Sequence, residues 1–166
     1  MENKENIIDS DFDIFINTVF EIRGKLLQTC IELELKMDGY IAEHFCETEE
    51  KIIEFGSIVL APRISWGEKL NIFSVIIEKY NPDFLKEYPS FHSDIKKIIE
   101  HRTVFAHYPA DITITGVERF KNTRMPETSK IVYASIPSYS NEDINSILRG
   151  IHTYTTAIDI MIRIGK

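Results

Sequence analysis

The chain has 166 residues, of which 43% are hydrophobic, and a formal net charge of −7 at pH 7. This length is enough for one domain that buries a core without disulfides or metal ions. The acidic isoelectric point, near 5.3, argues against a protein that coats nucleic acid, because such binding is driven by clustered lysine and arginine. No apolar run reaches the roughly 18 residues that span a bilayer, so we expect a cytoplasmic protein without membrane contact.

Cysteine and histidine spacing gives no sign of a metal site or a cofactor. Cys30 and Cys46 fall in one predicted helix, too far apart for a disulfide, and we interpret them as reduced packing residues. The remaining histidines outside the motif discussed below have no ligand-like spacing with each other or with cysteine: His44, His92, His101 and His152. Glycine-rich nucleotide-binding patterns are also missing, so we expect no bound metal and no cofactor.

Helical periodicity dominates the first two thirds of the chain. It predicts a first helix over about 12–45, with Ser10 and Asp13 as the pair that caps its start. A shorter segment over about 49–60 follows and is interrupted by Pro62. Ser65 and Glu68 have the spacing of a capping box and begin a helix that stops at residues 81–82. The inner face of that helix is predicted to contain Trp66, Leu70, Phe73, Ile77 and Tyr80.

The last third of the chain combines a helix, an alternating stretch and a final helix. Ser90 opens a helix that ends near His107, before Pro109. Alternating Thr, Val and Ile residues over about 111–137 predict a β-hairpin. Ser140 and Asp143 cap the last helix, whose inward residues are Ile144, Ile147, Leu148, Ile151, Ile158 and Ile162. We therefore predict a mainly α fold in one domain over 1–166, an up-and-down bundle of four main helices with a small β-hairpin inserted before the last helix.

A cation lies within the apolar face of the helix that ends near His107. At about 100° per residue, Arg102 shares a face with Ile95, Ile98, Ile99 and Ala106. A buried guanidinium needs a partner. His107 falls in the last turn, near an edge or cleft, where a group that titrates near neutrality can act in acid/base chemistry.

Two carboxylates on the first helix are candidates for that partner. Glu34 and Asp38 lie among apolar residues, opposite the polar stripe of their helix. We hypothesise that one of them contacts Arg102, since unpaired buried charges cost several kcal/mol each. Either the ion pair only fixes the register of the helices, or the carboxylates hold the guanidinium at the wall of a cleft, ready for a phosphate.

These residues resemble the motif of the HEPN (higher eukaryote and prokaryote nucleotide-binding) superfamily. That motif is an arginine, four to six intervening residues and a histidine near a helix end, as in Arg102 and His107. Thr103 stands where the family usually has Asn; it keeps a hydroxyl but lacks the paired donor and acceptor of an amide. The run Arg23-Gly24-Lys25-Leu26-Leu27, with Glu34, also looks like the opening helix of bacterial HEPN-type proteins. The resemblance covers roughly residues 11–109 and, by topology, the last helix.

The resemblance implies metal-independent RNA cleavage, or RNA, nucleotide or partner binding, possibly in a toxin–antitoxin or defence system. In that reading His107 is the general base or acid and Arg102 holds the phosphate, with Thr103, Glu34 and Asp38 in support. An arginine and a histidine five residues apart differ by about 140° around an ideal helix and do not share a face. We therefore expect one site to need residues from two subunits, which agrees with the family's homodimers.

The sequence leaves two questions open: the role of the hairpin tip, and whether the protein is an enzyme or a binding module. Arg119, Lys121 and Arg124 make the tip basic; it either steers RNA toward the cleft or is a solvated loop. The alternative function is a non-catalytic interaction or regulatory module. Its Arg102 would be a structural ion-pair residue, and its acidic surface would bind a protein partner such as an antitoxin.

Overall fold

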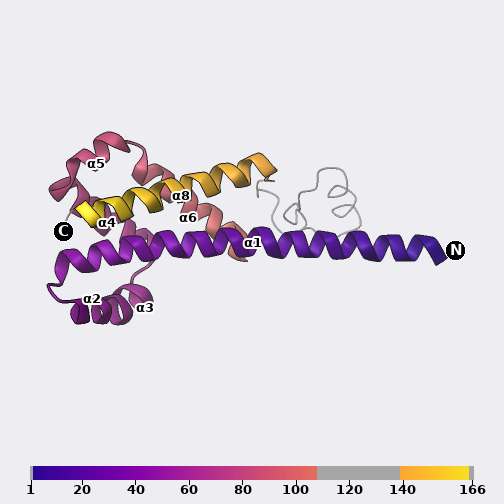
Figure 1. The fold of residues 1–166 in the computed structure, drawn as a ribbon, viewed down its shortest axis with the longest axis horizontal. Coiled ribbons are helices and arrows are strands. Elements are labelled where there is room, and N and C mark those ends of the chain that lie inside the picture. The colour runs from indigo at the N-terminus through magenta and orange to yellow at the C-terminus, as the bar shows by residue number, and fades with distance from the viewer. Residues whose placement is uncertain (1, 108–138, 165–166) are drawn as a thin grey trace. The chain divides into compact units, whose positions relative to one another are not determined.

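The computed structural model describes residues 2–107 and 139–164, and these residues are mainly helical (Figure 1). The mainly α fold class is therefore confirmed, whereas the hairpin expected at 111–137 lies outside the described residues. None of the described helices is long and apolar enough to cross a bilayer. The elements are α1 (Glu2–Phe45), α2 (Glu49–Phe55), the π-helix η1 (Gly56–Leu60), α3 (Ala61–Arg63), α4 (Trp66–Tyr80), α5 (Pro82–Glu87), α6 (Phe91–His107) and α8 (Asn141–Ile164).

The chain forms two compact units. Unit 1 comprises residues 1–28 and 102–148, and unit 2 comprises residues 29–101 and 149–166. The boundaries between them fall inside α1, α6 and α8. The single domain expected over 1–166 stays a prediction.

The first helix begins earlier than predicted. It runs for 44 residues from Glu2, so Ser10 and Asp13 are interior residues and not its cap. The sequence from residue 2 to residue 23 contains neither proline nor glycine, and serine and aspartate are tolerated within a helix at a modest cost. Nothing in the sequence therefore stops the helix at Ser10.

Pro62 does not end the helical segment that precedes it. The backbone widens into η1, where the N–H of Ala61 bonds to the carbonyl of Gly56, and α3 continues to Arg63. A proline ring clashes with the carbonyl four residues earlier, here that of Ile58, and has no N–H to donate. A π-type turn just before the proline changes this register and lets the helix continue.

The predicted start of α4 is confirmed, and its end is more elaborate than expected. Ser65 and Glu68 form a capping box, and the predicted inner face is buried except for Tyr80, which is 54% exposed. The helix stops at Asn81 as predicted. Pro82 then starts the short helix α5, which the sequence analysis did not predict, because proline suits the first position of a helix.

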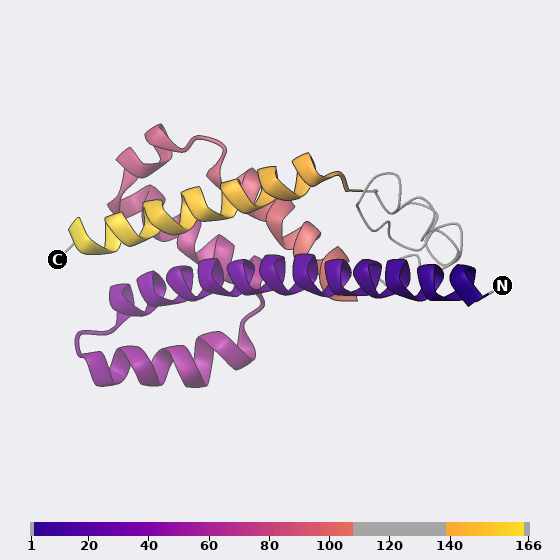
Figure 2. The ribbon, with the colours of Figure 1, turned by 45° about the vertical axis from the view of Figure 1, so that its right-hand side comes forward.

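The helices of unit 2 have directions that follow from their contacts. Lys69 near the start of α4 meets Glu34 and Asp38, and Tyr80 at its end meets His44, so α4 runs parallel to α1. This is possible because the α2–α3 segment runs back along α1, on the side opposite to α8 (Figure 2). The up-and-down alternation therefore includes that segment, and the four main helices do not alternate by themselves.

Aromatic rings form the centre of unit 2. The ring of Phe91 lies 5.4 Å from that of Phe73, 5.2 Å from that of Phe84 and 5.2 Å from that of Tyr154, centroid to centroid. The hydroxyl of Tyr154 donates a hydrogen bond of 2.7 Å to Asp94. This bond ties α8 to the first turn of α6, which is the helix that carries the candidate site.

The last helix confirms its predicted cap and most of its predicted inner face. The amide and hydroxyl of Ser140 bond to Asp143, and Ile144, Ile151 and Ile158 are buried. Ile147, Leu148 and Ile162 are half-buried. In unit 1, Phe105 of α6 contacts Tyr139 just before α8, with ring centroids 4.8 Å apart.

Replacing Tyr154 with Phe tests the hydrogen bond to Asp94. This bond is the largest cause that lowers the pKa of Asp94 below its ordinary value of 3.8, so its contribution is present above pH 3.8 and is lost as the pH falls through the folded-state pKa. We expect Tyr154→Phe to lower the free energy of unfolding by about 1 kcal/mol at pH 7, a figure discounted for the partial exposure of Asp94. Urea denaturation at pH 7 and pH 3 measures the difference.

The matched control is Tyr80→Phe, because the Tyr80 side chain is half-exposed. That variant should be as stable as the parent chain at both pH values. If Tyr154→Phe is destabilised equally at pH 7 and pH 3, the bond to ionised Asp94 is not the cause.

Candidate functional site

Arg102 lies in α6 on the row of side chains that faces the interior of the helix packing. Ile95 and Ile98 precede it on this row and Phe105 follows, with exposed fractions of 0%, 5% and 8%. Arg102 itself is half-buried. Arg102 thus follows two buried isoleucines along the helix, and the residue as a whole is only partly covered.

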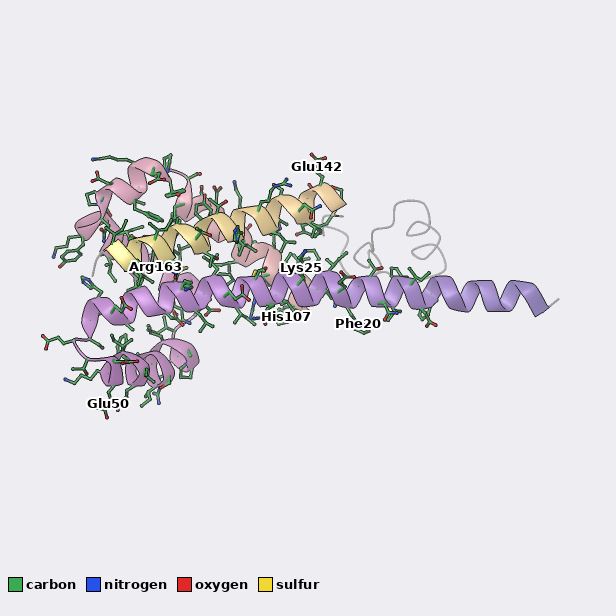
Figure 3. The ribbon with its side chains drawn as sticks, viewed as in Figure 1. Phe20, Lys25, Glu50, His107, Glu142 and Arg163 are labelled. Carbon is green, nitrogen blue, oxygen red and sulfur yellow. The ribbon has the colours of Figure 1, made fainter. Side chains whose placement is uncertain are left out.

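His107 is the last residue of α6 and its side chain is exposed. Figure 3 labels it, together with Phe20 and Lys25 of α1 in the same unit. The free carbonyls at a helix C-terminus favour a positive charge there. His107 follows Arg102 by five positions along the helix, a rise of about 7.5 Å, and Thr103 between them is exposed.

The two carboxylates of α1 that the sequence suggested as partners of Arg102 bind a lysine of their own unit. The ammonium of Lys69, on α4, donates hydrogen bonds of 2.7 Å to Glu34 and 2.8 Å to Asp38. Lys69 is 1% exposed and Asp38 is 7% exposed. The carboxylates are therefore part of a buried ion cluster between α1 and α4.

The pKa values of Lys69 and Asp38 are shifted by burial and by the sharing of one ammonium between two carboxylates. Burial alone would lower the pKa of Lys69, but its hydrogen bonds to Asp38 and Glu34 outweigh burial and raise the pKa above the ordinary value. Burial raises the pKa of Asp38, and the bond from Lys69 offsets only part of this shift. The second carboxylate oxygen of Asp38 is buried and has no hydrogen-bond partner among the described residues. Lys69 is thus charged, and removing it would leave Asp38 in a costly state.

The predicted site residues do not all belong to the same unit. Arg102, Thr103 and His107 belong to unit 1, whereas Glu34 and Asp38 belong to unit 2. The basic residues proposed for the hairpin tip, Arg119, Lys121 and Arg124, lie outside the described residues. The structure thus gives Glu34 and Asp38 a partner in their own unit and leaves Arg102 and His107 as the pair that defines the candidate site.

Two charged residues were missed or underused by the sequence analysis. Lys69 follows Trp66 by three residues and precedes Phe73 by four, so its place on the inner face of α4 was visible in the sequence. Arg23 of unit 1 is half-buried, and burial lowers its pKa. Arg23 and Arg102 are thus the two guanidinium groups among the described residues of unit 1.

A serine and a histidine in unit 2 also lie within hydrogen-bond distance. Ser74 Oγ is 2.9 Å from His92 Nδ1, but the same hydroxyl donates a bond of 2.7 Å to the carbonyl of Leu70. Its proton is thus directed to the backbone, and the histidine nitrogen is left to act as the donor. This arrangement caps polar groups on α4 and α6 and does not activate a nucleophile.

Neither a metal site in the described residues nor a likeness to a known protein constrains the chemistry further. No group of His, Cys, Asp and Glu side chains within the described part of the chain could hold a metal ion. Comparisons with protein-family models, with curated proteins and with solved structures find no match.

Replacing Lys69 with Met tests the buried ion cluster. Because Asp38 would be left buried without its cation, we expect the free energy of unfolding to fall by about 3–5 kcal/mol. Denaturation in urea measures the change, and the double variant Lys69→Met/Asp38→Leu should recover much of it.

Lys36→Met is the matched control for that variant. Lys36 also makes an ion pair between two helices, with Asp159 at 2.5 Å, but it is 42% exposed. Its loss should have a much smaller effect, because exposed pairs contribute little. Equal losses in the two lysine variants would contradict a special role for burial at Lys69.

Proposed function

We propose that the chain is a HEPN-like, metal-independent endoribonuclease whose active centre contains Arg102 and His107. The observation that supports this proposal is the exposure of the two side chains and the identity of the cation that binds the carboxylates of α1. Arg102 is half-buried in an apolar row, His107 is exposed at the end of the same helix, and the carboxylates suspected of neutralising the arginine bind Lys69. An arginine in such a place suits a phosphate, which its fork of donors can bind in two places.

The chemistry needs only a proton acceptor, a proton donor and a cation. His107 removes the proton of a ribose 2′-hydroxyl, and the oxygen attacks the adjacent phosphorus. The bond to the 5′-oxygen then breaks, and that oxygen takes up a proton from a histidine. Arg102 stabilises the charge that develops on the phosphate oxygens. The products are a 2′,3′-cyclic phosphate and a 5′-hydroxyl.

The proposal includes a homodimer that acts in the cytoplasm, where its RNA substrate is found. Arg102 and His107 point about 140° apart around α6, so a second subunit supplies the missing half of each site. In unit 1, the side chain of Phe20 is 68% exposed, and a subunit interface would cover it. Thr103, in place of the usual Asn, favours a slow enzyme.

A regulatory function is the second candidate. Apolar side chains are exposed on unit 2 as well, with Leu35 at 59% and Ile53 at 64%. Such surface favours a protein partner, for example an antitoxin-like inhibitor. In this alternative the chain binds its partner without cleaving RNA.

Incubating the purified protein with single-stranded RNA in EDTA tests the proposed function. We expect cleavage that leaves 2′,3′-cyclic phosphates and that stops at a position where the RNA carries a 2′-deoxyribose. His107→Ala should slow it by about 10²–10⁴-fold, and Arg102→Ala by about 10²–10³-fold. Arg149→Ala and His152→Ala change exposed residues of α8 and are the matched controls.

Cleavage that survives both Arg102→Ala and His107→Ala would come from another site or a contaminant and would refute the proposal. RNA binding without cleavage, weakened by Arg102→Ala and not by Arg149→Ala, would identify a degenerate RNA-binding relative. Absence of both cleavage and binding would favour the regulatory module.

The variant Glu34→Gln tests whether Glu34 contributes to RNA cleavage or only to the stability of the fold. Because Glu34 is bonded to Lys69, we expect the variant to lose stability in urea and to keep the RNA-cleavage rate of the parent chain. A large loss of cleavage without a loss of stability would mean that Glu34 does assist Arg102, as the sequence suggested.

A further inference from the structure

Unit 2 contains an open groove that the proposed RNA chemistry does not use. It lies between α5 and the C-terminal part of α8 and has a volume of about 370 Å³. The rings of Tyr80, Phe84 and Tyr88 line one side, and Ala157, Ile160 and Met161 line the other. Binding sites for small ligands have volumes of about 300–1,000 Å³ and a similar mixture of apolar and aromatic walls.

The walls of the groove expose apolar surface to water. Tyr80 is 54% exposed, Ile160 is 51% exposed and Ile164, at one end, is 79% exposed. Covering such surface is favourable. A ligand for this groove therefore has an apolar body.

The charged side chains that line the groove are acidic. Asp83 and Glu87 line it, and none of the described residues that line it is a lysine or an arginine. Lys86, which is not part of the lining, pairs with Asp83 at 2.6 Å. Glu87 is therefore the carboxylate that remains for a ligand in the groove. Burial raises the pKa of Tyr88, and Glu87 adds to this rise. The groove thus disfavours phosphates and carboxylates and favours a cation.

The aromatic rings favour the same kind of ligand. The ammonium of Lys79 already lies 5.0 Å from the ring centroid of Tyr80, a distance at which the ring attracts a cation. Tyr88 and Phe84 present further rings beside the two carboxylates. Aromatic faces combined with carboxylates are well suited to organic cations.

We propose that this groove is a binding site for a small organic cation, an ammonium or guanidinium group on an aliphatic body. The apolar body contacts Ile160 and Met161, and the charged group lies near Glu87 and the tyrosine rings. The site is independent of Arg102 and His107, which belong to unit 1.

NMR titration of the full chain with three probes of equal length tests the site. The probes are hexylamine, hexanol and hexanoate, which share an aliphatic chain and differ in charge. We expect hexylamine to shift the amide signals of residues 80–88 and 157–164 and to bind roughly fivefold more tightly than hexanol. Hexanoate should bind most weakly.

Two variants locate the charge and the apolar contact. Glu87→Gln should weaken hexylamine roughly fivefold and leave hexanol unchanged, whereas Glu78→Gln, an equal change of charge on α4 outside the groove, should have no effect. Ile160→Asn should weaken both probes. Equal affinity for hexylamine and hexanol, or shifts spread over the whole acidic surface, would overturn the proposal.

The test is separate from the RNA experiment. Arg102→Ala and His107→Ala should bind hexylamine as the parent chain does, so a failure of one proposal leaves the other standing.

Discussion

The ion cluster of Lys69, Glu34 and Asp38 is the constraint on which the interior of unit 2 depends. A lysine that is 1% exposed is tolerated only because two carboxylates meet its ammonium at 2.7 and 2.8 Å. Sliding α4 along α1 by one turn would separate these charges at a cost of several kcal/mol. The cluster therefore fixes the register of two parallel helices.

This cluster changes how Arg102, the other cation on an apolar helix face, is interpreted. From the sequence, Arg102 and Lys69 are both cations that need a partner, and Glu34 and Asp38 are the obvious partners for either. The structure assigns both carboxylates to the lysine. The arginine then has a different environment: it is half-buried in a helix that ends in an exposed histidine.

Local features of the chain were predictable because they depend on neighbouring residues. The capping boxes at Ser65 and Ser140 and the end of α4 before Pro82 follow from short patterns, and each is found. The pairing of Glu34 with Lys69, 35 residues apart, was not predictable, since helical periodicity gives the face of a side chain and not the helix that meets it. The continuation through Pro62 was missed for a related reason, because a π-turn leaves no signature in the spacing of apolar residues.

Arginine is the cation best suited to the place that α6 offers. Its guanidinium is weakly hydrated and stays charged, so half-burial costs it less than it would cost lysine. Lys69, fully buried, needs two permanent carboxylates to remain in place, whereas Arg102 at its half-buried position can leave its donors open to a transient anion. Within residues 2–107 and 139–164 no carboxylate forms an ion pair with Arg102, and this difference between the two cations is the physical reason to test phosphate binding at Arg102.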